Sequence, residues 1–171
     1  MAEVELQGEL GTYDRGDATL GLVLEPYGEP EQTGIRVMVS LTTKRVTVSY
    51  VTSTRGYCLA SFLHDVEACL SAHDGAAELY DPEITEDHVL LRVVATRAPR
   101  GAFLVSGLWE GFHLDERFPE TARVREEPYP YGLGISFQGL EVLHPALDRF
   151  IRHLRRELVV SGVDMSRPQW M

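Results

Sequence analysis

The most regular pattern along the chain is an apolar stripe with helical spacing between Tyr57 and His73. Its members recur at intervals of three and four residues, which places them on one face of an amphipathic helix. They are Leu59, Phe62, Leu63, Val66, Cys69 and Leu70. A second stripe of the same kind lies near the end of the chain and consists of Leu143, Leu147, Phe150, Ile151, Leu154 and Leu158. The sequence therefore predicts two helices, over residues 57–72 and 144–160.

Most of the remaining chain alternates apolar and polar residues with the period of two that is typical of half-buried strands. We expect strands over residues 18–24, 35–41, 45–52, 77–80, 88–96, 102–110 and 133–140. Apolar Leu90 and Val94 break the alternation within their segment, which indicates a strand that is central or covered on both sides. The hydroxyl of Ser53 or Thr54 is expected to cap the first helix. Residues 112–130 show no periodicity and are expected to form a long polar loop.

The order of these elements predicts a single α+β domain over residues 1–171, made mostly of antiparallel sheet with both helices packed on one face. A length of 171 residues is typical of one domain. Residues 1–17 are polar and rich in Gly, Asp and Glu, so we expect a loosely ordered lead-in or an edge strand there. The tail, residues 161–171, is expected to be loosely ordered as well.

The net charge of the chain limits the kinds of molecule that the protein is expected to bind. It has 26 acidic and 16 basic side chains, and its formal net charge is −10 at pH 7. A surface of that sign repels phosphate backbones, so nucleic-acid binding is not expected. The same surface can attract a basic protein, which is the expected partner, and the alternative is ordinary acidity that only favours solubility.

Several features indicate a bacterial protein of the cytoplasm. The N-terminus lacks the basic and apolar regions of a signal peptide, and no apolar run reaches the ~20 residues that cross a bilayer, so no membrane association is expected. Cys58 and Cys69 lie about 16 Å apart along one predicted helix, and two reduced thiols are typical of cytoplasmic proteins. Fifteen arginines against one lysine suggest a GC-rich bacterial genome.

The sequence carries no recognisable pattern for catalysis or for cofactor binding. Its six histidines lack metal-ligand spacing, and there is no C-x-x-C. Ser106 and Ser136 lie in strand-like alternation and not on the sharp turn of a nucleophile elbow. The glycines of YGLGISFQG do not make a phosphate-binding loop, because Phe137 stands where the last glycine would be. We therefore expect no catalytic residue, no metal and no cofactor, and a non-enzymatic role is favoured.

Two surface segments are candidate binding sites. The long loop interleaves carboxylates with aromatic residues, a combination that suits docking onto a basic protein, since aromatic side chains anchor a contact and charge speeds the encounter. Its expected partner-binding residues are Asp115, Glu116, Phe118, Glu120, Glu126, Glu127, Tyr129 and Tyr131. A loop that is merely solvated is the alternative.

The other candidate is a patch of three arginines on one face of the second predicted helix, suited to an anion or a partner. These residues are Arg149, Arg152 and Arg156. The alternative is a favourable placement of cations near a helix C-terminus, together with pairing to Asp148 and Glu157.

Four segments and the closing helix follow one another in an order known from other small acidic bacterial proteins. The segments are ASFLHDVEACL, HVLLRVVAT, GAFLVSGLWEG and GISFQGLEV. In this layout the chain resembles the WapI-like immunity proteins and related actinobacterial families. The resemblance implies a stoichiometric binder that masks a toxin, and it implies no catalytic residues.

Two further functions remain open at this point. A small-molecule enzyme or ligand binder would use a pocket on the open face of the sheet, lined by Tyr50, Phe103, Trp109 and Phe137. A secretion chaperone or assembly subunit would use an apolar sheet face or helix stripe as its interface, and the isolated chain would then be a homodimer.

Overall fold

The computed structural model of the protein describes residues 2–10, 16–27, 34–42, 47–80, 89–96, 101–110, 122–125 and 134–163. In these residues the chain forms nine strands and two helices. The strands are β1 (Ala2–Leu10), β2 (Gly16–Tyr27), β3 (Gly34–Thr42), β4 (Thr47–Arg55), β5 (Ala76–Tyr80), β6 (Val89–Ala95), β7 (Ala102–Glu110), β8 (Ala122–Arg125) and β9 (Gly134–Leu143). The helices are α1 (Gly56–Ala72) and α2 (His144–Val160). The α+β class and both predicted helices are thus confirmed.

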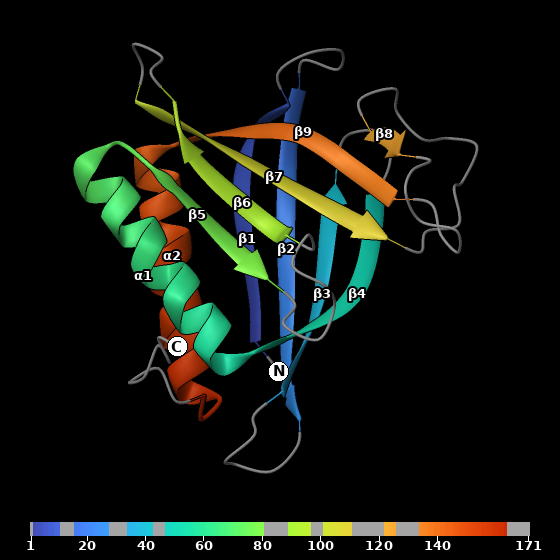
Figure 1. Cartoon of the computed structure of the whole chain (residues 1–171), viewed down its shortest axis with the longest axis vertical. Coiled ribbons are helices and arrows are strands. Elements are labelled where there is room, and N and C mark those ends of the chain that lie inside the picture. The colour runs from blue at the N-terminus through green and yellow to red at the C-terminus, as the bar shows by residue number, and fades with distance from the viewer. Residues whose placement is uncertain are drawn as a thin grey trace.

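All strand pairs are antiparallel, and the strands follow one another in the order β4-β3-β2-β1-β9-β7-β6-β5. The chain therefore contains two successive units, four strands with α1 and five strands with α2, which join where β1 pairs with β9. β8 lies in the expected loop region and pairs with the part of β9 that β1 does not reach. The curved sheet encloses one core, and the two helices lie side by side against it (Figure 1).

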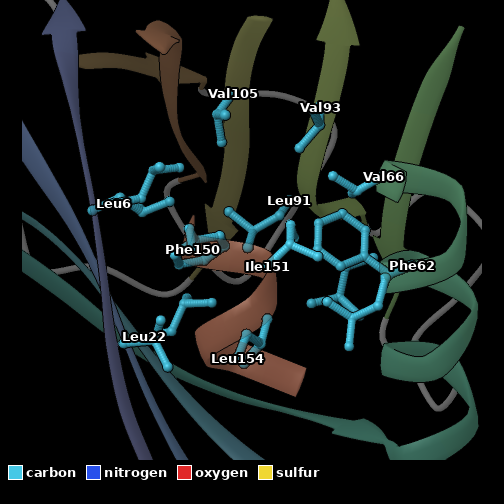
Figure 2. Close-up of a cluster of buried hydrophobic side chains, with 14 of the residues drawn as sticks. Leu6, Leu22, Phe62, Val66, Leu91, Val93, Val105, Phe150, Ile151 and Leu154 are labelled. Atoms are coloured by element: carbon cyan, nitrogen blue, oxygen red, sulfur yellow. The ribbon is translucent and has the colours of Figure 1, made fainter. Parts of the chain in front are cut away.

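The core forms where the apolar stripes of both helices meet the inner face of the sheet. All six residues of the α1 stripe are buried, and so are Leu147, Phe150, Ile151, Leu154 and Leu158 of α2. Figure 2 shows side chains of both helices converging with those of strands from both halves of the sheet, among them Leu6, Leu22, Leu91, Val93 and Val105. Leu143, which the helical spacing also assigned to the second stripe, instead ends β9 and is 56% exposed.

The first strand differs from the lead-in or edge strand expected for residues 1–17. β1 pairs with β2 along its whole length and with β9 at its end, so it lies in the interior of the sheet. Val4 and Leu6 are each 1% exposed and belong to the core. At the other end of the chain, Val163 is buried and its backbone N–H donates to the carbonyl oxygen of Leu158 at 3.0 Å, while residues 164–171 lie outside the described part.

A bulge explains why β6 breaks the alternation of a half-buried strand. Leu79 of β5 pairs with Leu91, but the next residue, Tyr80, pairs with Val89, so Leu90 is the extra residue. Leu90 and Leu91 are consequently both buried, at 2% and 1% exposure, although they are neighbours in sequence. The bulge alone accounts for the burial of Leu90, so no other element has to pack on the outer side of β6 to explain it.

The two strands at the ends of the sheet order meet at one corner of the core. The Thr54 hydroxyl of β4 donates a hydrogen bond of 2.7 Å to the carbonyl oxygen of Tyr80 in β5. Thr54 therefore does not cap α1, as was expected for it or Ser53. The N-cap residue is Arg55, and no side chain caps this helix end through a hydrogen bond.

Candidate binding surface on the outer face of the sheet

The side of the sheet that the helices leave uncovered, here called the outer face, is formed by the polar half of each strand's alternation. In β1, Val4 and Leu6 point into the core, whereas Glu3, Glu5 and Glu9 are exposed. These three carboxylates share the outer face, because successive side chains of a strand point to opposite faces. β1 lies in the middle of the strand order, so its carboxylates lie between the two halves of the sheet.

Three carboxylates on the outer face stand beside one another on three neighbouring strands. Glu9 of β1 pairs with Asp17 of β2 on one side and with Glu141 of β9 on the other. Directly opposite residues of an antiparallel sheet have Cβ atoms about 4.5–5.5 Å apart, so these like charges repel one another. All three are exposed, and none forms an ion pair with a residue in the described ranges. We call Asp17, Glu9 and Glu141 the acidic row.

Apolar side chains continue the line of the acidic row toward one edge of the sheet. Glu141 pairs with Leu104 of β7, and Leu104 pairs with Val94 of β6. Leu104 is 39% exposed, and Val94 is half-buried beside it on the same face. Exposed apolar groups next to unpaired charges are a combination found at protein-docking surfaces, where a desolvated centre borders a polar rim.

Two other carboxylates of the outer face, Glu25 and Glu78, each lie close to an arginine. Arg36 Nη1 lies 3.2 Å from Glu25 Oε2, and Arg92 Nε lies 3.3 Å from Glu78 Oε1. Tyr80 also donates a hydrogen bond to the Glu78 carboxylate, and this bond raises the pKa of the Tyr80 phenol above its ordinary value. Glu3 and Glu5 have no such cation among the described residues, but they pair with Val23 and Gly21, so the acidic row differs from them in that its carboxylates lie directly opposite one another.

Apart from Ala122–Arg125, which form β8, the acidic and aromatic loop that the sequence indicates as a partner-binding segment lies outside the described residues. This applies to all eight of its predicted site residues: Asp115, Glu116, Phe118, Glu120, Glu126, Glu127, Tyr129 and Tyr131. Its role in partner binding stays a prediction.

The hypothesis of a ligand pocket on the open sheet face is wrong in its placement of Phe103. This residue is fully buried in the core, and its ring centroid lies 5.0 Å from that of His73 in an edge-to-face arrangement. It therefore fills the interior at the end of α1. Tyr50, Trp109 and Phe137 lie on β4, β7 and β9, but their side chains are outside the described part of the structure.

The arginines of the second helix are placed as their spacing predicts. Arg149, Arg152 and Arg156 are all exposed on α2. Arg152 Nε lies 3.1 Å from Asp148 Oδ2 one turn away. Such pairing with Asp148 is the expected alternative to a binding role for these arginines. For Arg149 and Arg156, no ion pair joins them to any of the described residues.

Two histidines contact backbone carbonyl groups at the ends of the helices. His144 Nε2, at the start of α2, lies 3.2 Å from the carbonyl oxygen of Leu70 in the last turn of α1. His73 Nε2, just after α1, lies 3.1 Å from the carbonyl oxygen of Thr96. A ring N–H is the donor in each case, since a carbonyl oxygen only accepts. Across the described ranges, no group of three or more His, Cys, Asp or Glu side chains is arranged to hold a metal ion.

The Cys69 thiol should react slowly with alkylating reagents. It is 3% exposed; burial raises its pKa above the ordinary value, and the nearby carboxylates of Asp65 and Asp74 raise it further. Less thiolate is therefore present at a given pH, and thiolate is the reactive form. At pH 8 we expect iodoacetamide to modify Cys69 at least about ten-fold more slowly in the folded protein than in urea. Mass spectrometry of the Cys69 peptide measures both rates, and equal rates would contradict this assignment.

No helix in the described ranges combines the length and the apolar character that crossing a membrane requires. Comparisons of the chain with protein-family models, with curated proteins and with solved structures found no match. The resemblance to the WapI-like immunity proteins accordingly stays a prediction from the sequence.

The acidic row is a feature that sequence reasoning missed. A local signal for part of it exists, because residues 3–9 alternate glutamate or glutamine with apolar residues or glycine. That alternation is typical of a half-buried strand with carboxylates on one face. No local signal places Glu141 next to Glu9, since the pairing of β1 with β9 joins distant parts of the chain.

Proposed function

We propose that this chain is a non-catalytic acidic binding protein that docks a basic protein on its acidic row. The observation that carries the proposal is the row itself, in which three exposed carboxylates lie side by side without a cation from any described residue. A basic partner would supply the missing cations. Leu104, exposed at the end of the row, would supply apolar contact area.

Electrostatics support this proposal at short and at long range. At short range, like charges directly opposite in a sheet destabilise it, and cations of a bound partner would remove that repulsion. At long range, the net charge of −10 attracts a basic protein and accelerates its diffusional encounter with the chain. Both effects weaken as salt screens the charges, so the rate of association should fall with ionic strength.

The more specific form of the proposal is an immunity-like inhibitor whose basic partner is a toxin. Its support is the resemblance in layout to the WapI-like immunity proteins. In this form the chain acts by occupying a basic surface of the toxin in a 1:1 complex, and it needs no catalytic residue of its own.

A charge-reversed acidic row should abolish partner binding. We propose to capture partners from a lysate of the source organism at about 0.15 M salt, using tagged wild-type protein and the variant Glu9→Lys/Glu141→Lys. The wild type should recover one basic protein in stoichiometric amount, and the variant should lose it. Both substituted residues are exposed, so the urea midpoint of the variant should not fall below that of the wild type.

A matched control is Glu3→Lys/Glu25→Lys, which makes the same change in net charge on the same face. Glu3 lies about 20 Å along the strand from Glu9, so a contact centred on the row should survive this change. If the row variant retains the partner, or if the control loses it equally, the acidic row is not the docking site. The recovered protein is then expressed in cells with and without the wild-type chain. If that protein is a toxin, it should stop cell growth when expressed alone, and the wild-type chain should restore growth.

A further inference from the structure

The solvent-facing side of α2 carries charge opposite to that of the acidic row and ends in exposed apolar residues. Arg149, Arg152 and Arg156 follow one another along the helix, and Val159 and Val160 come one turn later. The two valines are 59% and 76% exposed, the latter being the most exposed large apolar residue in the described ranges. We call these five residues the basic stripe.

The basic stripe is held in place but is only partly neutralised. Arg155, on the neighbouring side of α2, forms two hydrogen bonds of 2.8 and 3.1 Å with Glu67 Oε1 of α1 and so joins the two helices. Within the stripe, Arg152 contacts Asp148, whereas Arg149 and Arg156 have no carboxylate partner among the described residues. The stripe is therefore a surface that can accept carboxylates.

The spacing of the basic stripe matches that of the acidic row. At a rise of 1.5 Å per residue, Arg152 and Arg156 lie about 4.5 and 10.5 Å from Arg149 along the axis, and the valines lie at about 15–16.5 Å. Neighbouring strands are about 4.8 Å apart, so on the outer face Glu9 and Glu141 lie at about 4.8 and 9.6 Å from Asp17. Leu104 and Val94 continue that line at about 14 and 19 Å.

We propose that copies of this chain associate head to tail, with the basic stripe of one copy lying across the acidic row of the next. The helix would cross the strands, so that cations face carboxylates and apolar residues face apolar residues in one register. In that register Arg149 meets Asp17, Arg152 meets Glu9, Arg156 meets Glu141, and Val159 and Val160 cover Leu104 and Val94.

Such a contact is heterologous, because it joins two different surfaces of the molecule. The stripe lies on the helix side and the row on the outer face, so each copy in a pair keeps one unused surface, and assembly continues into short chains or a ring. An anionic membrane is a weaker occupant of the stripe, since the net charge of −10 repels it. The repulsion between two copies is screened beyond about 8 Å at 0.15 M salt, whereas the contact pairs are much closer.

Sedimentation velocity of the full chain over a range of concentrations tests this proposal. At about 0.15 M salt the average mass should rise above 19.2 kDa with concentration, and at about 1 M salt, where the Debye length is about 3 Å, it should return toward that value. Glu9→Lys/Glu141→Lys and Arg152→Glu/Arg156→Glu, which alter the two sides of the same two charge pairs, should each remain monomeric at 0.15 M salt. Only exposed residues change, and circular dichroism verifies that both variants fold.

The decisive variant combines all four substitutions in one chain, which restores two charge pairs with exchanged signs, leaves the pair of Arg149 with Asp17 as it is and keeps the net charge at −10. It should self-associate again. A wild type that stays monomeric at every concentration overturns the proposal, and so does association that grows with salt or that the fourfold variant fails to recover. If the proposed function also holds, a second copy and a basic partner compete for Glu9. The sedimentation tests do not depend on the proposed function.

Discussion

Replacing Phe62 with alanine should lower the free energy of unfolding by about 3–5 kcal/mol. Phe62 is 1% exposed and projects from α1 into the space between the helices and the sheet, close to Val66 and Leu91 (Figure 2). The substitution removes the transfer free energy of the ring and leaves a cavity that rigid neighbours cannot fill. The expected loss is a large part of the about 5–15 kcal/mol that stabilises a typical domain.

Urea unfolding followed by circular dichroism measures this loss. Val160→Ala provides the control, because that side chain is 76% exposed and its truncation should change the free energy by less than about 0.5 kcal/mol. A loss below about 1 kcal/mol at Phe62 would mean that α1 does not close the core as described.

Replacing Gly8 with alanine should destabilise the protein by about 1–3 kcal/mol. A Cβ atom at this position would lie 2.6 Å from the carbonyl oxygen of Glu141 and 2.7 Å from Leu140 Cγ. Both atoms belong to β9 at the point where it joins β1, and a backbone atom cannot move aside without shifting the strand pairing. The glycine is therefore needed for the close approach of the two halves of the sheet.

Gly21→Ala is the matched control for this second prediction. Gly21 lies on the adjacent strand β2, and its added Cβ would meet Ser40 Oγ, the end of a side chain that can rotate away. Alanine also restricts the unfolded chain, so this variant should be neutral or slightly stabilising. Equal destabilisation by the two substitutions in thermal or urea unfolding would contradict the special role of Gly8.

The predicted helices and most of the strands follow from the local sequence because their signal is a short repeat. The α2 boundaries are those predicted, and α1 begins one residue earlier than expected. The stripe residues identified from spacing are the ones that the core buries, apart from Leu143. A period of 3.6 or 2 residues marks the buried side of an element irrespective of what lies against it, so these assignments need no knowledge of the tertiary structure.

The candidate binding surface depended instead on how the strands pair. The sequence by itself determined that Glu9, Asp17 and Glu141 are acidic residues in separate segments, and that three arginines share a helical face. Only the sheet order, which places β1 between β2 and β9, brought these three carboxylates into one row. It also turned an apparently polar lead-in into an interior strand. Strand pairing joins residues that are far apart in the chain, and local periodicity contains no information about which strands become neighbours.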